Sequence, residues 1–171
     1  MYLIIPLLPS YPGQIGTRNA DTMQTILYHE YQTLFRAENS IFKCLKKNNI
    51  EPSDYILLMG LRQHGLIKDV PFTEMIYVHS KIMIVDDIHA IIGSANLNDR
   101  SMLGNRDSEI VVHVEEEVNS INDSLPPFAK DLRIKLMSEH FGIDIPNDLD
   151  PVSLDSKFWN EVKSLCEVMI N

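Results

Sequence analysis

A histidine, a lysine and an aspartate lie close together in the middle of the chain, at His79, Lys81 and Asp86. The composition of residues 77–86 predicts a β-strand. In a strand, side chains two positions apart share a face, so His79 and Lys81 are expected to point one way and Asp86 the other. A histidine beside a cation suits phosphodiester chemistry, because the lysine attracts phosphate oxygens and the imidazole serves as nucleophile, acid or base near neutral pH. A chance pair of surface side chains is the alternative interpretation.

The residues after this stretch predict a β-hairpin that brings further polar groups to the same end. Residues 86–87 are an aspartate pair typical of a turn, and an apolar run then leads into Gly93, Ser94 and Asn96. The returning strand would carry Ser94 and Asn96 back towards the histidine and the lysine. Both side chains can hydrogen-bond to an anion, and Gly93 allows a ligand or backbone to approach closely. Ordinary strand-end turn residues would show the same composition.

A third strand is predicted over residues 110–114, directly after Glu109. A carboxylate at that position could orient an imidazole through a hydrogen bond. Arg100 and Arg106 precede it and are candidate phosphate partners, although a loop salt bridge is the role we expect for each.

Together these segments resemble a known catalytic motif block. The pattern H-x-K-x4-D at 79–86, G-S-x-N at 93–96 and R-D-S-E-I at 106–110 is similar to the second motif block of the eukaryotic phospholipase D family, named HKD after its three signature residues. Weaker similarity extends upstream to residues 5–9 and downstream to residues 158–159. The resemblance therefore covers nearly the whole chain.

The resemblance implies both a fold and a domain organisation. The fold would be α/β, a three-layer α/β/α sandwich with a mixed sheet that forms one phospholipase D catalytic lobe. Residues 1–115 would form this HKD lobe. Residues 116–171 would form an acidic loop and a C-terminal helical extension packed on the same lobe.

The resemblance also implies an activity, the hydrolysis of phosphatidylcholine-like phospholipids to phosphatidic acid and a free alcohol through a phosphohistidine intermediate. His79 would act as general acid and base and Lys81 would hold the phosphate, while Ser94 and Asn96 would line the site. Glu109 would orient His79. Asp86, the third signature residue of the catalytic motif, would be mainly structural.

The family builds its site from two HKD motifs, whereas this sequence contains one. A second HKD lobe is therefore an expected partner, either a missing N-terminal half or a second copy of the chain. The first residues, Met1 to Pro9, resemble a strand already in progress and favour the first arrangement. A homodimeric single-motif phosphodiesterase or nuclease, with two copies of His79 at a two-fold axis, remains an alternative. So does an inactive lobe that binds phospholipid or a partner.

Composition narrows the expected partners and location. The formal net charge of −9 opposes non-specific attraction to nucleic acid, so nucleic acid is not favoured and a phospholipid at a membrane surface is. The sequence shows no signal peptide or membrane span. Cys44 and Cys166 are predicted to be buried thiols, which suits a reducing compartment. We expect an intracellular, cytoplasmic protein that is peripheral at membranes.

The remaining segments are interpreted as scaffold. Residues 21–47 predict one long amphipathic helix and residues 55–61 a buried strand. An acidic loop is expected over 115–124, followed by a helix from Pro127 that stops at Gly142 and by a final apolar-striped helix over 158–169. No cofactor or metal is expected, since the HKD chemistry needs none and Glu115 to Glu117 have no second ligand cluster beside them in the sequence.

Overall fold

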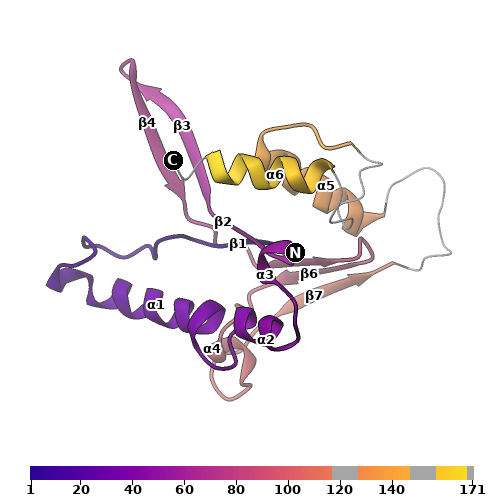
Figure 1. Cartoon of the computed structure of the whole chain (residues 1–171), viewed down its shortest axis with the longest axis horizontal. Coiled ribbons are helices and arrows are strands. Elements are labelled where there is room, and N and C mark those ends of the chain that lie inside the picture. The colour runs from indigo at the N-terminus through magenta and orange to yellow at the C-terminus, as the bar shows by residue number, and fades with distance from the viewer. Residues whose placement is uncertain (117–126, 147–156, 169–171) are drawn as a thin grey trace. The chain divides into compact units, whose positions relative to one another are not determined.

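A computed structural model describes residues 1–116, 127–146 and 157–168 (Figure 1). The chain divides into two compact units, Met1–Val78 together with the segment from Trp159 onward, and His79–Phe158. The organisation into a lobe over 1–115 and an extension over 116–171 stays a prediction.

The first unit contains a two-stranded parallel sheet. Strand β1 (Tyr2–Ile4) pairs with β2 (Leu57–Met59), and Tyr2 is the partner of Leu57. The rings of Tyr2 and Trp159, on α6 (Lys157–Val168), meet edge to face with centroids 5.3 Å apart. The two apolar segments predicted as strands, Met1 to Pro9 and residues 55–61, thus each contain a strand, which is shorter than expected.

The long helix predicted over residues 21–47 is broken. A 3-10 turn, η1 (Arg18–Ala20), leads into α1 (Asp21–Tyr31), and the π-helical η2 (Gln32–Arg36) ends at extended Ala37, before α2 begins (Ile41–Lys47). Ser40 causes the restart, because its side chain caps the new helix by accepting from the Lys43 N–H at 3.4 Å. A short helix, α3 (Pro52–Tyr55), follows.

A long hairpin that the sequence interpretation missed follows β2. Strands β3 (Leu61–Ile67) and β4 (Val70–Ile76) are antiparallel in continuous register, and Ile67 is the partner of Val70. Lys68 and Asp69 form the turn with φ values of 51° and 64°. This backbone is the one a two-residue hairpin requires, but glycine or asparagine usually supplies it.

The second unit contains a three-stranded antiparallel sheet in the order β5 (Ile82–Val85), β6 (His89–Gly93), β7 (Val111–Glu115). The predicted hairpin and third strand are therefore confirmed. Asp86 and Asp87 form the turn with φ values of 53° and 58°. A short helix, α4 (Asp99–Met102), precedes β7, and α5 (Phe128–Phe141) packs against all three strands (Figure 1).

Strands of both directions combine with helices, so the predicted α/β class is confirmed. In the described residues the strands form three small sheets rather than one. Gly142 ends α5 with φ 65°, as predicted. Cys44 is exposed, which corrects the expected burial, because α2 is a short separate helix whose residues are all at least partly accessible.

Other predictions fall partly outside the described residues: most of the acidic loop, at 117–124, Met169 and the side chain of Cys166. Among the helices that the structure describes, none has the length and apolar character needed to cross a membrane.

One ion pair anchors the hairpin turn to α5. Arg133 has a side chain that is only 9% exposed, and its guanidinium donates to Asp87 through Nε at 2.6 Å and Nη2 at 2.8 Å. The pairing is bidentate, the geometry that makes an arginine–carboxylate contact strong and directional. It fixes the end of the sheet where β5 turns into β6.

We predict that Arg133→Ala destabilises the chain by about 2–3 kcal/mol, because it leaves the Asp87 carboxylate partly buried without its partner. Lys135→Ala is the matched control on the same helix: its pair with Asp131 is exposed, and its loss should cost less than about 0.5 kcal/mol. Urea unfolding measures both. Equal effects would mean that the Arg133 pair does not anchor the turn.

Candidate functional site

Four of the predicted site residues line one open cleft of about 520 Å³ in the second unit: His79, Lys81, Ser94 and Asn96. The remaining lining residues are Ser80, Ile82, Ile92 and Gly93. The cleft thus lies where β5 begins and β6 ends. The hairpin brings the two halves of the motif together as the sequence indicated.

The local backbone at the histidine differs from the expectation. His79 and Lys81 lie in an extended segment before β5, not within a strand, so strand alternation does not set their directions. The Lys81 carbonyl accepts from the Gly93 N–H at 3.1 Å, which holds this segment against β6. The Lys81 ammonium turns back and donates to the His79 carbonyl at 2.5 Å. The pair is held close by this contact instead of by a shared strand face.

Ser94, in the other wall of the cleft, forms hydrogen bonds with the backbone of Ile110, which directly precedes β7. Its N–H donates to the Ile110 carbonyl at 2.9 Å, and its hydroxyl accepts from the Ile110 N–H at 3.0 Å. At the adjacent Gly93, a Cβ would collide with that same Ile110 carbonyl oxygen. Glycine is therefore required there for the two strands to approach.

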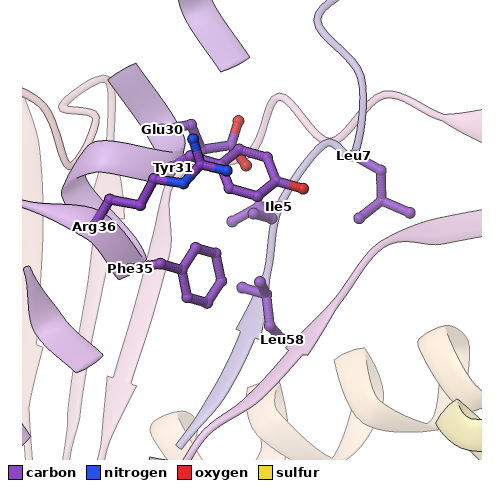
Figure 2. Close-up of a pocket in the computed structure, with 7 residues that line it drawn as sticks. All are labelled: Ile5, Leu7, Glu30, Tyr31, Phe35, Arg36 and Leu58. Atoms are coloured by element: carbon purple, nitrogen blue, oxygen red, sulfur yellow. The ribbon is translucent and has the colours of Figure 1, made fainter. Parts of the chain in front are cut away.

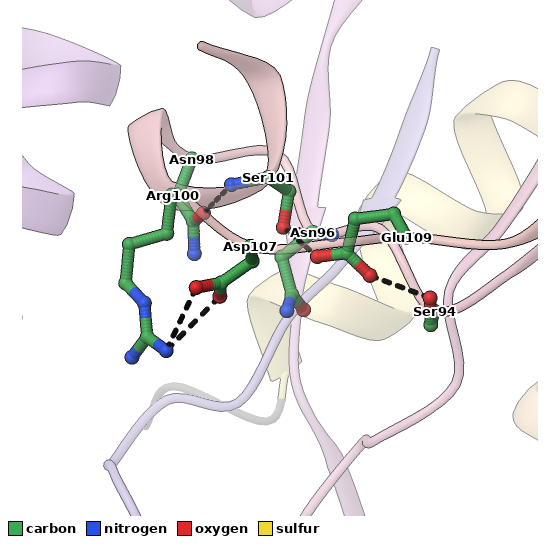
Figure 3. Close-up of polar contacts among 7 residues, drawn as sticks. All are labelled: Ser94, Asn96, Asn98, Arg100, Ser101, Asp107 and Glu109. Atoms are coloured by element: carbon green, nitrogen blue, oxygen red, sulfur yellow. Dashed lines mark hydrogen bonds and ion pairs between the residues drawn. The ribbon is translucent and has the colours of Figure 1, made fainter. Parts of the chain in front are cut away.

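Glu109 is the centre of a polar network that includes the cleft residue Ser94 (Figure 3). Its two carboxylate oxygens accept from the hydroxyls of Ser94 and Ser101, each at 2.5 Å. The Ser101 N–H in turn donates to the side chain of Asn98, which caps α4, at 3.1 Å. The hydrogen bonds from Ser101 and Ser94, in that order, lower the pKa of Glu109, and the charges of Lys81 and Arg100 add to the effect.

The network includes two residues that sequence reasoning missed, Asn98 and Ser101. Their spacing, an asparagine three residues before a serine at the start of a helical turn, is a capping pattern that could have indicated α4. The hydrogen bond from the Ser101 hydroxyl to Glu109 has no such local signal, because it joins residues eight positions apart and depends on the path of the loop between them.

The sequence also matches known proteins. A family model described as phospholipase D matches residues 70–170, which include the whole cleft. The chain belongs to the phospholipase D family. Its similarity to individual relatives extends further towards the N-terminus, over 84–96% of the chain.

Among these relatives, phospholipase D zeta 1 of Arabidopsis thaliana is 45% identical over 163 residues, which cover 88% of this chain and 15% of the relative. Phospholipase D1 of Homo sapiens is 44% identical over 172 residues, 95% of this chain and 16% of the relative. Phospholipase D1 of Saccharomyces cerevisiae is 39% identical over 152 residues, 84% and 9%. The chain therefore spans about a sixth or less of the length of these relatives.

The third signature residue of the family motif lies away from the cleft. Asp86 is in the turn at the opposite end of the hairpin and is not among the lining residues. Its neighbour Asp87 makes the ion pair with α5. Arg100 pairs with Asp107 at 3.0 Å, which confirms the expected loop salt bridge for that arginine.

A second cleft, of about 340 Å³, lies in the first unit (Figure 2). Most of its lining is apolar or aromatic, and its charged members are Glu30 and Arg36. Burial raises the pKa of Glu30, and the Arg36 guanidinium lies 5.4 Å from the centre of the Tyr31 ring. None of the family's HKD, G-S-x-N or R-D-S-E-I residues lines it, so it is the weaker candidate for phosphate chemistry.

We predict that Ser101→Ala raises the pKa of Glu109 towards its usual value, and by more than Ser94→Ala does, because Ser101 contributes the larger lowering. A carboxylate with a lowered pKa stabilises the fold above its unfolded pKa, and this contribution is lost as the pH falls through the folded value. NMR titration of the Glu109 carboxyl carbon measures the shift. Ser53→Ala, which removes a hydroxyl bonded to Glu51, is the control. An unchanged pKa in Ser101→Ala would contradict the network.

Proposed function

We propose that the chain supplies the second HKD half-site of a phospholipase D-type phosphodiesterase. The reaction is hydrolysis of phosphatidylcholine-like phospholipids to phosphatidic acid and a free alcohol through a phosphohistidine intermediate. The observation that carries the proposal is the convergence of His79, Lys81, Ser94 and Asn96 on one open cleft. Family membership supports the reaction class.

Lys81 is positioned to hold a phosphate oxygen. Its ammonium has three donors, and one of them is used on the His79 carbonyl. Among the described residues the other two donors have no hydrogen-bond partner, so they can serve the substrate, while the carbonyl contact limits the motion of the long side chain. Asn96 adds a side-chain amide at the same cleft, which can donate to a second phosphate oxygen.

His79 is the proposed general acid and base, which protonates the departing alcohol and then activates water. Glu109 is the carboxylate proposed to orient its imidazole. Each carboxylate oxygen accepts one serine hydroxyl and retains a further lone pair for an imidazole N–H. The hydrogen bonds that lower the pKa of Glu109 favour its ionised form, and this anion could stabilise an imidazolium beside it.

Ser94 has a more specific role than lining the site. Its single hydroxyl proton is given to Glu109, and the same oxygen accepts from the Ile110 N–H. Ser94 therefore acts mainly as a positioning residue that connects the cleft to Glu109. Asp86 is proposed as a supporting residue of the hairpin turn.

A second HKD lobe is the proposed partner, because the two-step displacement needs a nucleophilic histidine besides the acid and base. The start of β7 supports a partner surface near the cleft: Ile110, Val111 and Val112 are 80%, 50% and 60% exposed. In the described residues β7 is an edge of its sheet, and exposed apolar edges favour association with another chain or lobe. The partner lobe would be an N-terminal half or a second copy of this chain.

The alternatives differ in what they require. A homodimeric single-motif phosphodiesterase needs two copies of the cleft to face each other, and an inactive lobe needs only binding. Nucleic acid is the less favoured substrate, because a net charge of −9 opposes its approach. The proposed location is the cytoplasm, at the surface of membranes.

The experiment measures phosphatidic acid formation from phosphatidylcholine vesicles, with the chain alone and with the chain mixed with the N-terminal half of a phospholipase D relative. We predict that His79→Asn lowers the turnover of whichever assembly is active by at least about 10³-fold, because the acid and base are lost. Its circular dichroism spectrum should be unchanged, since His79 lies in an exposed loop.

His29→Asn is the matched control, an exposed histidine on α1, and should keep full activity. Light scattering gives the mass of the active species and separates a homodimer from a mixed assembly. Most activity retained in His79→Asn would remove His79 from the mechanism. No turnover in either assembly would favour the inactive lobe.

A further inference from the structure

Two histidines and a glutamate converge on β6 and β7, at the end of these strands away from the cleft. They are His89, His113 and Glu115, and one possible ligand atom from each lies within 4.8 Å of the other two. None of the three lines the cleft. The proposed phosphodiester chemistry makes no use of them.

Strand pairing explains the convergence. His89 is the direct partner of Glu115 across the β6–β7 ladder, and His113 lies two residues before Glu115 on the same strand. All three side chains therefore point to one face of the sheet. The next residue, Ala90, is fully buried, so by alternation the histidine belongs to the opposite, accessible face.

The backbone at this end of the sheet is held in place beyond the strand pair itself. The Glu116 N–H donates to the Ile88 carbonyl at 3.2 Å, which continues the ladder past Glu115. The cluster therefore has a defined register on two connected strands, the kind of rigid support that a metal site requires.

The spacing of the two imidazoles fits a tetrahedral metal. His89 Nδ1 lies 3.3 Å from His113 Nε2. Two nitrogen ligands at about 2.0–2.1 Å from zinc, at a tetrahedral angle, are separated by about 3.3–3.4 Å. Glu115 supplies a third, anionic ligand, and its long side chain can close the remaining distance. His113 and Glu115 are exposed, which leaves a fourth position open to water.

We propose that His89, His113 and Glu115 form a binding site for a divalent transition metal, with zinc as the ligand that best fits two imidazoles and one carboxylate. Calcium and magnesium fit poorly, because they prefer oxygen ligands. On β6, His89 lies four residues before Gly93, which lines the cleft. At the usual rise of a strand, these four residues span about 13 Å. The role of the site is structural: the metal joins β6 to β7 and so stabilises the sheet that positions Ser94 and Glu109.

The test uses the chain after removal of any affinity tag, since a histidine tag would itself bind zinc. Calorimetric titration with zinc chloride should show one zinc per chain with a dissociation constant of about 1 μM or tighter. Zinc should also raise the temperature of thermal unfolding, because it binds only the folded arrangement.

His113→Ala should weaken zinc binding by at least about a hundredfold and abolish the thermal shift. Glu115→Gln, which keeps the shape of the side chain and removes its charge, should weaken binding about tenfold or more. His29→Ala is the control and should bind zinc as the unchanged chain does, because His29 is an exposed histidine outside the cluster. Circular dichroism without metal checks that each variant folds.

Three results would overturn the proposal: no saturable binding below about 100 μM zinc, binding that His113→Ala leaves unchanged, or one zinc per two chains. The first would mean that the two imidazoles share only the hydrogen bond at 3.3 Å. The second would place the zinc elsewhere in the chain. The third would assign it to a contact between copies.

Discussion

The carboxylate of Glu109 joins the segments that form one wall of the cleft. One oxygen accepts from Ser94 at the end of β6 and the other from Ser101 in α4, while Glu109 itself directly precedes the Ile110 backbone that pairs with Ser94. These contacts hold the G-S-x-N segment in place against β7. They also connect the fold to the proposed chemistry, since the same serine hydroxyls that fix the loop lower the pKa of the Glu109 carboxyl.

The parts of the site that could be predicted from the sequence depend on local rules. The aspartate pair at 86–87 indicated the hairpin, and the hairpin by itself places Ser94 and Asn96 near His79. The stop of α5 at Gly142 follows from the preference of a left-handed residue for glycine. In each case a short stretch of residues sets the geometry.

The parts that were missed depend on contacts between distant residues or on weak local signals. The turn at Lys68 and Asp69 has the required positive φ without the glycine that usually marks it. Strand alternation did not apply to His79 and Lys81, because β5 begins only at Ile82 and a side chain to backbone bond holds the pair. The cluster around His89 becomes visible only when the register of β6 against β7 is known.

Contacts within this one chain already arrange the charged and polar groups of the proposed half-site. Such an arrangement would suit the proposed assembly with a second lobe, because neither half would have to rearrange when the two meet. The exposed apolar residues at the start of β7 support the proposed contact with a second lobe. The net charge of −9 opposes approach to an anionic surface, so binding there would depend on local features such as Lys81.

The most direct test of this account is an NMR titration of the isolated chain with inorganic phosphate, which measures whether the cleft binds an anion without a second lobe. We predict saturable shifts, with a dissociation constant of about 1 mM, at the backbone amides of Lys81, Gly93, Ser94 and Asn96, and their loss in Lys81→Met. Phosphate that causes no saturable shifts, or shifts that map to the cleft at Arg36, would contradict the assignment of this cleft as the phosphate half-site.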